Sequence, residues 1–285
     1  MKGEIIRKKL INGERIYGTH IASLGNPLAA RLTSDVEMDF VFICTEHMPI
    51  DRTEVAMMCQ LYSAWGISPM VRIPYPSAHW ACMAMDGGAE GIVAPYVETV
   101  EQVEELVGAV KYRPIKGKFL QDIFSGERKP AVKLKNYIEN FNKDKYLIIG
   151  VESVEAINNL ESLISVEGVD GVFLGPHDIT CSMEIPEEYE NPLFLEALIK
   201  VVRTCRKMNK GVGLHMDASS DIYKILLHEG LNYVLNAADV TKMRGTLNGD
   251  FRRIREIYGD TYERGNATLK ENNLCISKDG KKKKS

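Results

Sequence analysis

The sequence predicts a (β/α)8 barrel, the TIM-barrel fold, and three observations support this prediction. Short apolar runs alternate with segments of helical periodicity along almost the whole chain, in eight strand-then-helix units. The runs are nearly free of charge, which is typical of parallel strands buried on both faces. The 285 residues also match the roughly 250 residues of one such barrel. An open doubly wound sheet is the alternative, but neither GxGxxG nor a P-loop lysine follows the first strand.

The eight predicted strands are short and end at Gly, Pro or polar residues, which favour turns. They cover residues 17–23, 39–45, 68–74, 91–95, 146–152, 171–175, 211–215 and 232–238. Their spacing leaves room for a helix between consecutive strands, as parallel neighbours require.

Several predicted helices begin with recognisable caps. Asn26 and Pro27 open the first helix, and Asp51 caps a helix that runs to about residue 65. Thr99 and Gln102 form a capping box for a helix that ends near residue 110. The remaining predicted helices cover 79–86, 131–141, 154–164 and 192–207, and one more follows each of the last two strands. Between 111 and 145 the pattern loosens into a longer connection, which carries the 131–141 helix.

We expect one barrel domain over residues 1–260 and a polar C-terminal tail over 261–285. The tail ends in a short lysine run, which is typical of a solvated, mobile segment. Acidic and basic residues nearly balance, at 39 against 36 with a formal charge of -3, which argues against nucleic acid as the main partner.

The sequence also predicts a cytoplasmic protein without a membrane partner. The N-terminus has no apolar stretch of signal-peptide length, and no later stretch is long enough to span a bilayer. The six cysteines are scattered and form no CxxC pair, which favours reduced thiols in a cytosolic protein.

Polar side chains follow several of the predicted strands, at the end of the barrel where active sites lie. Glu46 and His47 follow the second strand, Arg72 ends the third, Glu152 ends the fifth and Asp178 follows the sixth. Because barrel closure brings distant strand ends to one rim, we expect these side chains to converge.

Each of these residues also has an ordinary structural explanation. Glu152 and Asp178 could cap helix N-termini, Arg72 could form an ion pair on the rim, and an isolated histidine such as His47 is usually a surface side chain. For three further histidines near strand ends the structural explanation is preferred: His20, His177 and His215. The joint placement of the acids, the arginine and His47 favours a site.

The residue types indicate the chemistry of that site. Two carboxylates without cysteine or paired histidine ligands suit a hard divalent cation, Mg²⁺ or Mn²⁺, that completes its shell with water and substrate oxygens. Zinc is disfavoured. No lysine stands at the end of a predicted strand, where an imine-forming amine would be needed, so carbonyl chemistry here would use a metal.

Several stretches together resemble the HpcH/HpaI aldolase family, class II enzymes such as the 2,4-dihydroxyhept-2-ene-1,7-dioate aldolases. The resemblance runs from about Gly18 to Asp260 and is carried by "DFVFICTEH", "PMVRIP", "MDGGAEGIVAP", "IIGVES", "EGVDGVFLGPHDIT" and "NAADV". It implies a phosphoenolpyruvate/pyruvate-binding barrel and a lyase that reversibly cleaves a 4-hydroxy-2-oxo acid to pyruvate and an aldehyde. It also implies a homo-oligomer, a hexamer or trimer that exchanges a C-terminal helix.

The family's functional residues map onto this chain one by one. The metal ligands fall on Glu152 and Asp178, which would hold Mg²⁺ or Mn²⁺ against the pyruvate oxygens. The family's arginine falls on Arg72, a donor to the keto or enolate oxygen, and its histidine falls on His47, which would move the proton of the aldol hydroxyl. The amides that would hold the substrate carboxylate lie around Gly175, Pro176 and His177, although proline itself has no N–H.

Two positions depart from the family pattern. Cys44 stands where the family has an aspartate three residues before the histidine, and Gly150 replaces a glutamine two residues before the metal-binding glutamate. Other functions therefore remain open at this point. They are oxaloacetate decarboxylation, citrate-lyase-like cleavage of a carbon–carbon bond, or a catalytically weakened barrel that binds a metabolite.

Overall fold

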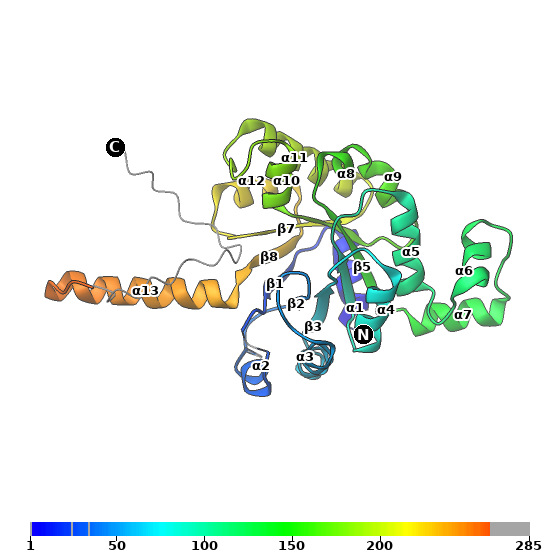
Figure 1. The fold of residues 1–285 in the computed structure, drawn as a ribbon, viewed down its shortest axis with the longest axis horizontal. Helices are drawn as coiled ribbons and strands as arrows, with labels where there is room; N and C mark the ends of the chain where they lie inside the picture. The colour runs from blue at the N-terminus through cyan, green and yellow to red at the C-terminus, as the bar shows by residue number, and fades with distance from the viewer. Residues whose placement is uncertain (1, 24, 34, 263–285) are drawn as a thin grey trace.

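The eight strands of the protein are all parallel and close into a barrel in chain order, which confirms the predicted fold class. This computed structural model describes residues 2–23, 25–33 and 35–262, so most of the expected tail at 261–285 lies outside the described residues. Figure 1 shows the barrel with its helices around it. The strands are β1 (Ile16–His20), β2 (Phe40–Cys44), β3 (Ser68–Arg72), β4 (Gly91–Ala94), β5 (Tyr146–Val151), β6 (Gly171–Leu174), β7 (Gly211–Met216) and β8 (Tyr233–Ala238).

The helices lie mostly where the capping signals place them. Asp51 and Thr99 both form the predicted capping boxes, which fix the starts of α3 and α5. The helices are α1 (Lys2–Asn12), α2 (Pro27–Thr33), α3 (Arg52–Ala64), α4 (Ala78–Asp86), α5 (Val100–Lys111), α6 (Gly117–Phe124), α7 (Val132–Phe141), α8 (Val154–Asn158), α9 (Leu160–Ser165), α10 (Pro176–Ser182), α11 (Pro192–Lys207), α12 (Asp221–Glu229) and α13 (Asp239–Tyr258).

The structure differs from the sequence prediction in four helical segments. The helices α1, α6 and α10 were not predicted, and the helix predicted over 154–164 is divided at Asn159 into α8 and α9. Short helices of one to three turns carry too little periodicity to be recognised, since packing rather than propensity stabilises them. The difference matters most at α10, because Asp178 lies in the first turn of this helix and not in a loop.

Two parts of the chain extend away from the barrel (Figure 1). The helices α6 and α7 form a pair on one side, and α13 extends from β8 on the other. No residue of α13 is buried within this chain, although it carries exposed apolar side chains. These are Met243, Leu247, Phe251, Ile254, Ile257 and Tyr258. In the described part of the chain, no helix is both long and apolar enough to cross a membrane.

Alternate residues of the strands point into the barrel, where they form a closed core of their own. This inner core includes Phe40 and Phe42 of β2 and Met70 of β3, whereas Val41 and Ile43 face the surrounding helices. In the interior, large side chains lie opposite small residues, which leave the room that the large ones fill. At Gly91 any side chain would overlap the Tyr146 ring, so the inner core is packed and leaves no channel along the barrel axis.

The helix α1 covers the N-terminal end of the barrel. Its buried residues Ile6 and Leu10 join the inner core, and Leu10 lies against Gly211 at the start of β7. Arg7 of the same helix donates a hydrogen bond from Nε to Asp170 Oδ1 at 3.0 Å. The barrel is therefore closed at the end opposite to the one where the candidate residues lie.

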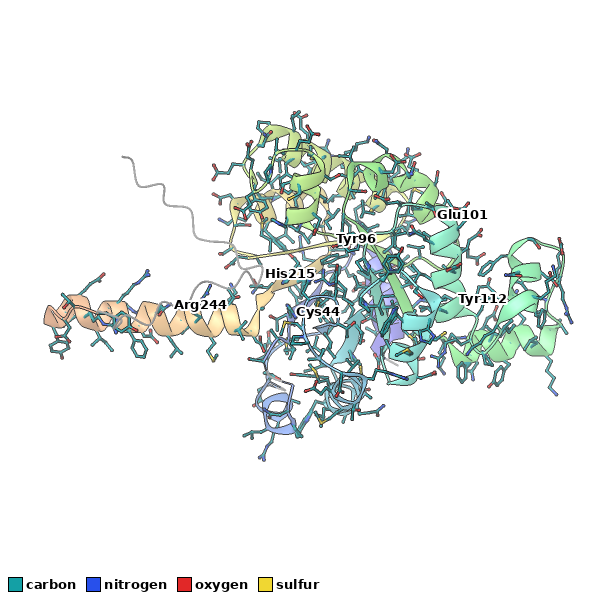
Figure 2. The ribbon with its side chains drawn as sticks, in the orientation of Figure 1. Cys44, Tyr96, Glu101, Tyr112, His215 and Arg244 are labelled. Atoms are coloured by element: carbon teal, nitrogen blue, oxygen red, sulfur yellow. The ribbon has the colours of Figure 1, made fainter. Side chains whose placement is uncertain are left out.

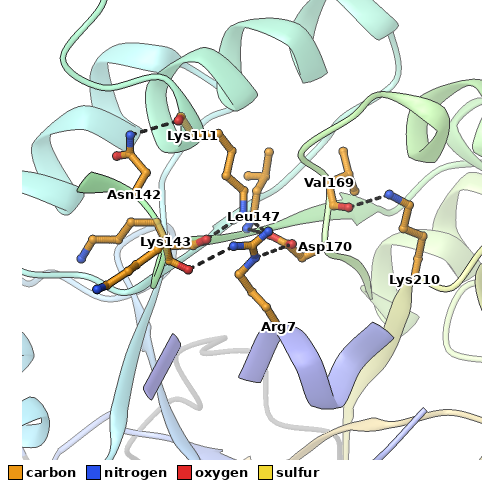
Figure 3. Close-up of polar contacts among 9 residues, drawn as sticks. Arg7, Lys111, Asn142, Lys143, Leu147, Val169, Asp170 and Lys210 are labelled. Carbon is orange, nitrogen blue, oxygen red and sulfur yellow. Dashed lines mark hydrogen bonds and ion pairs between the residues drawn. The ribbon is translucent and has the colours of Figure 1, made fainter. Parts of the chain in front are cut away.

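Asp170 is the centre of a buried charged cluster at this closed end (Figure 3). Its carboxylate accepts hydrogen bonds from Arg7, from Lys111 Nζ at 2.5 Å and from the backbone N–H of Leu147 at 2.8 Å. Burial lowers the pKa of Lys111 to about 8, and Asp170 opposes this shift. The carboxylate is thus needed to keep the buried ammonium charged.

Replacing Asp170 with Asn should destabilise the protein by about 3 kcal/mol, because it leaves the buried Lys111 ammonium without its counter-charge. The free energy of unfolding from urea titration measures the effect. Asp250→Asn, which removes an exposed partner of Arg253 on α13, is the matched control and should change stability by less than about 0.5 kcal/mol. Equal losses in both variants would contradict the assignment of Asp170 as a buried anchor.

Candidate active site

The functional candidates continue the inward-facing positions of their strands to the C-terminal end of the barrel. In β2 the inward series Phe40 and Phe42 leads to Cys44, and in β3 Met70 leads to Arg72. In β5 the series that contains Ile148 leads to Glu152. Because side chains alternate strictly along a strand, this register sets Arg72 and Glu152 in the barrel mouth. Figure 2 shows Cys44 in this region together with Tyr96 and His215.

The two predicted acids lie close together. Glu152 is only 4% exposed, and Asp178 is half-buried in the first turn of α10. A methyl group on Gly175 would lie 2.8 Å from Asp178 Oδ2 and 2.9 Å from Glu152 Oε1. The two carboxylates therefore approach each other at Gly175, where any side chain would crowd both of them.

The Glu152 carboxylate carries a charge that its surroundings do not fully compensate. Burial raises the pKa of Glu152 to about 7, and the nearby acids Asp178 and Glu46 raise it further. Two groups lower the pKa of Glu152 instead. They are the backbone N–H of Tyr96, which donates to Glu152 Oε2 at 2.9 Å, and the guanidinium of Arg72. A bound cation would supply the missing positive charge.

These residues fit a divalent metal with an open coordination sphere. The described residues contain no group of three or more His, Cys, Asp or Glu side chains arranged around one metal position. Mg²⁺ and Mn²⁺ do not need such a group, since they are often held by one or two carboxylates with water and substrate oxygens. The two acids that meet at Gly175 agree with a site of that kind.

Arg72 is buried beside the acids, with 6% of its surface exposed. Its Nε and Nη2 atoms donate hydrogen bonds to Cys44 Sγ at 3.3 and 3.1 Å, and its Nε also lies 3.0 Å from Glu46 Oε2. The guanidinium lies over the rings of Phe42 and Phe173. Burial disfavours its charge, but Cys44 and Glu46 outweigh this and raise the pKa of Arg72. It is a fixed cation at the mouth.

His47 lies nearer the solvent, with 46% of its side chain exposed. Its Nε2 is 3.7 Å from Glu46 Oε2, whereas Cys44 Sγ accepts a hydrogen bond from the His47 backbone N–H and not from the imidazole. Burial and the nearby Arg72 lower the pKa of His47, with Glu46 and Asp178 opposing them. The imidazole is thus neutral near pH 7, as a general base must be.

The predicted carboxylate-binding segment forms the start of α10. Gly175 is the N-cap and Pro176 the first residue of the helix, and His177 is exposed. The N–H groups in the first turn of a helix have no partner within the helix. Those of His177 and Asp178 therefore remain the expected donors to a substrate carboxylate.

The sequence places Glu46 at the rim without giving it a role and does not single out Tyr96, yet both residues lie at the centre of this region. Glu46 has a side chain that is only 8% exposed, and its Oε2 atom has no aligned hydrogen bond although Arg72 is close. Tyr96 follows β4 and adopts a left-handed backbone conformation with φ 53°. No pattern in the sequence signals either role, because Glu46 lies beyond the end of its strand and Tyr96 lies in a loop.

His20 is buried and His215 is half-buried at the barrel mouth, and the centroids of their rings are 5.5 Å apart. His215 donates from Nε2 to the Ala237 carbonyl at 3.0 Å, whereas the Nε2 of His20 has no partner among the described residues. Burial lowers the pKa of His20 to about 3 and that of His215 to about 4. Their positions follow from the inward register of β1 and β7, which could have identified them as interior residues.

The neutral state of His20 predicts a pH-dependent loss of stability. Its pKa in the folded protein lies below the ordinary value, so the unfolded chain alone takes up a proton as the pH falls from about 6.5 toward 3. At pH 5 this amounts to about 2 kcal/mol. His20→Phe should remove this loss, so that its stability relative to the wild type rises between pH 8 and pH 5.

Urea unfolding at both pH values measures the difference. His79→Phe, at an exposed position in α4, should leave the pH dependence unchanged. A His20→Phe variant with the same pH slope as the wild type would show that His20 titrates in the folded protein as it does in the unfolded chain.

Comparisons with known proteins point to one family of enzymes. A sequence model of the HpcH/HpaI aldolase/citrate lyase family matches residues 21–241. The hydroxypyruvate/pyruvate aldolase of Roseobacter denitrificans is 26% identical over 240 residues, which cover 84% of this chain and 93% of that protein. The 4-hydroxy-4-methyl-2-oxoglutarate aldolase of Chaetomium globosum is 29% identical over 198 residues, or 68% of this chain and 73% of that protein.

Solved structures show the same architecture. An HpcH/HpaI aldolase from Desulfitobacterium hafniense superposes with a TM-score of 0.75 and 25% sequence identity, covering 88% of this chain and 96% of that one. A phosphonopyruvate hydrolase solved with oxalate and Mg²⁺ has a TM-score of 0.53 and 15% identity, so it shows a likeness of fold alone.

Proposed function

Because this chain belongs to the HpcH/HpaI aldolase/citrate lyase family and is a carbon–carbon lyase, we propose that it reversibly cleaves a 4-hydroxy-2-oxo acid to pyruvate and an aldehyde. The observation that carries the proposal is the pair of acids, Glu152 and Asp178, that approach each other at Gly175 next to a buried arginine. This arrangement provides a cation site and a fixed positive charge at one place. Both are needed to stabilise the enolate of a 2-oxo acid.

Glu152 and Asp178 would hold the divalent cation, which we propose is Mg²⁺ or Mn²⁺. When bound, the cation supplies Lewis-acid stabilisation of negative charge on the oxygens of the 2-oxo acid. The backbone N–H of Tyr96 holds Glu152 in place from the β4–α5 loop. Gly175 has no side chain that would crowd the two acids.

Arg72 would donate hydrogen bonds to the keto oxygen, which becomes negatively charged when the C3–C4 bond breaks. Its contacts with Cys44 and Glu46 hold the guanidinium in one orientation. The substrate carboxylate would lie against the amides around Gly175, Pro176 and His177, where the N–H groups of His177 and Asp178 are the donors. The substrate would thus be held by hydrogen-bond donors of the protein in addition to the cation.

His47 would take the proton from the C4 hydroxyl in the cleavage direction and return one to C3 of the enolate, directly or through water. Its lowered pKa leaves the imidazole neutral and able to accept that proton. Its exposure at the mouth is consistent with contact to the aldehyde half of the substrate.

The two departures from the family pattern have local structural reasons. Cys44 Sγ accepts hydrogen bonds from Arg72, so this position supports the arginine and leaves Glu46 as the acid nearest to His47. At Gly150 a side chain would lie 2.9 Å from both Ala94 O and Pro95 Cα, so β4 occupies the place that a glutamine would need. Neither departure removes a residue that the proposed reaction requires.

The proposal is tested by measuring pyruvate release from 4-hydroxy-2-oxo acids with Mg²⁺ or Mn²⁺ and again after chelation by EDTA. 2-Keto-3-deoxy-L-rhamnonate and 4-hydroxy-4-methyl-2-oxoglutarate are suitable substrates, since similar proteins are named for them. The second of them yields a second pyruvate in place of the aldehyde. We expect release that depends on the metal. Metal-independent release would contradict the proposal, and CO₂ from oxaloacetate without any aldol cleavage would favour a decarboxylase.

We further propose a cytoplasmic homo-oligomer, a hexamer or trimer, built from one barrel domain over residues 1–260. The exposed apolar side chains of α13 support association of copies through this helix, since none of them is buried within the described chain. The five cysteines among the described residues are free thiols, which supports a reducing compartment. Sedimentation of the full chain and of a chain ending at Ala238 would test the role of α13.

A further inference from the structure

Tyr96 occupies an unusual position at the mouth of the barrel. It follows β4 directly after Pro95, and its φ of 53° is a conformation that residues other than Gly, Asn and Asp rarely adopt. This conformation directs its backbone N–H to Glu152 Oε2 at 2.9 Å. The backbone of the loop and one of the proposed metal ligands are thus tied together.

The side chain of Tyr96 lies over the same acids. Tyr96 is 44% exposed, so part of this residue reaches the solvent at the C-terminal end of the barrel. Burial raises the pKa of its phenol, as do the carboxylates of Glu46, Asp178 and Glu152. A phenol among three acids keeps its proton and is a hydrogen-bond donor at every physiological pH.

The Glu46 carboxylate connects this phenol to the two residues that the proposed reaction uses. The phenol of Tyr96 is close enough to Glu46 for this carboxylate to raise its pKa, Arg72 Nε lies 3.0 Å from Glu46 Oε2, and His47 Nε2 lies 3.7 Å from the same oxygen. Three polar side chains therefore surround one buried carboxylate. An oxygen of a substrate that reaches His47 comes within range of the Tyr96 hydroxyl as well.

We propose that Tyr96 is a further catalytic residue, whose hydroxyl donates a hydrogen bond to the C4 oxygen of the 4-hydroxy-2-oxo acid. This inference rests on the proposed function. During cleavage His47 takes the proton of the C4 hydroxyl, the C3–C4 bond breaks, and its electron pair moves into the enolate of pyruvate. The C4 oxygen becomes the aldehyde carbonyl. Tyr96 stabilises the negative charge that this oxygen carries after it has lost its proton and before the carbonyl has formed. The Tyr96 hydroxyl keeps its own proton throughout.

The role assigned to Tyr96 is confined to one end of the substrate, and this makes it separable by experiment. Decarboxylation of oxaloacetate forms the same pyruvate enolate, but no charge develops on a C4 alkoxide. A residue that acts only on the C4 oxygen should therefore matter for aldol cleavage and not for decarboxylation. A residue that only supports Glu152 or the metal should affect both reactions alike.

The test compares Tyr96→Phe with the wild type and with Tyr75→Phe, an exposed tyrosine in the β3–α4 loop at the same end of the barrel. Phenylalanine keeps the ring and the backbone N–H and removes only the hydroxyl. We expect kcat/KM for cleavage of 4-hydroxy-4-methyl-2-oxoglutarate or 2-keto-3-deoxy-L-rhamnonate to fall about 100-fold, the usual loss for one donor to a developing oxyanion. Decarboxylation of oxaloacetate and the affinity for Mn²⁺ should stay unchanged, and Tyr75→Phe should match the wild type throughout.

Three outcomes would overturn the inference. In the first, Tyr96→Phe cleaves the aldol substrate as fast as the wild type, so the hydroxyl is not used. In the second, aldol cleavage, decarboxylation and Mn²⁺ affinity fall together, so Tyr96 acts by supporting Glu152. In the third, the wild type releases no pyruvate from any 4-hydroxy-2-oxo acid, and the proposed function fails together with the inference.

Discussion

Replacing Glu152 with Gln is expected to lower the rate of metal-dependent pyruvate release by about 1,000-fold, because it removes one of two carboxylates that would hold the cation. The substitution keeps the size of the side chain and an oxygen for the Tyr96 N–H. Affinity for Mn²⁺, measured by calorimetry, should fall with the rate. Glu139→Gln on the exposed face of α7 is the matched control and should change neither quantity.

The same substitution should stabilise the metal-free protein. The pKa of Glu152 in the folded protein is about 7, above its ordinary value of 4.5, so the folded state alone keeps the proton between these pH values. The protonated Glu152 side chain therefore contributes stability that is fully present below pH 4.5 and is lost as the pH rises through about 7. At pH 8 the buried carboxylate costs about 2–3 kcal/mol, and Gln avoids this cost.

Urea unfolding of both metal-free proteins measures the gain, which should grow from pH 5 to pH 7.5 and then stay level. In the wild type, binding of Mn²⁺ at pH 6 should also release protons, since the ligand must be ionised. A Glu152→Gln variant that is less stable than the wild type at pH 8 would show that the ionised Glu152 carboxylate does not destabilise the folded protein.

Replacing Arg72 with Lys should lower kcat/KM for aldol cleavage by about 1,000-fold, mostly through kcat. Lysine is a point charge and cannot donate to Cys44 Sγ from two nitrogens while it lies beside Glu46. It also loses the planar contact with Phe42 and Phe173. The oriented donor for the keto oxygen is therefore lost even though the charge remains.

Because the keto oxygen takes part in every reaction through the enolate, Arg72→Lys should impair oxaloacetate decarboxylation as strongly as aldol cleavage. This separates it from Tyr96→Phe, which should affect cleavage alone. Arg203→Lys is the control and should retain full activity. Arg203 lies in α11 and forms an exposed ion pair with Glu229 of α12, which lysine can keep. Full decarboxylase activity in Arg72→Lys would contradict the role given to the guanidinium.

The sequence was sufficient to predict the barrel and the strand that carries each candidate residue. The alternation of apolar runs and capped helices is repeated eight times, and errors in single boundaries do not change the order of the strands. The short helices α1, α6 and α10 were missed because they depend on tertiary contacts. In α1, for example, Ile6 and Leu10 are held by the inner core of the barrel.

The candidate site could be predicted as far as barrel closure brings the ends of the strands to one rim. Arg72 and Glu152 extend inward-facing series, so their convergence was expected and is observed in the structure. Glu46 and Tyr96 lie beyond the strand ends, where the path of the backbone decides the direction of a side chain. The left-handed conformation of Tyr96 has no sequence signal, since neither Gly nor Asn stands there.

The closure of one end of the barrel by α1 leaves a single route for both products. Glu152 and Arg72 are almost fully buried, whereas His47 is nearly half exposed, so the pyruvate half of the substrate would lie deeper than the aldehyde half. On the proposed function, the aldehyde must then depart before pyruvate can follow. Product inhibition should show this sequence, with pyruvate competing directly against the substrate and the aldehyde giving a noncompetitive pattern.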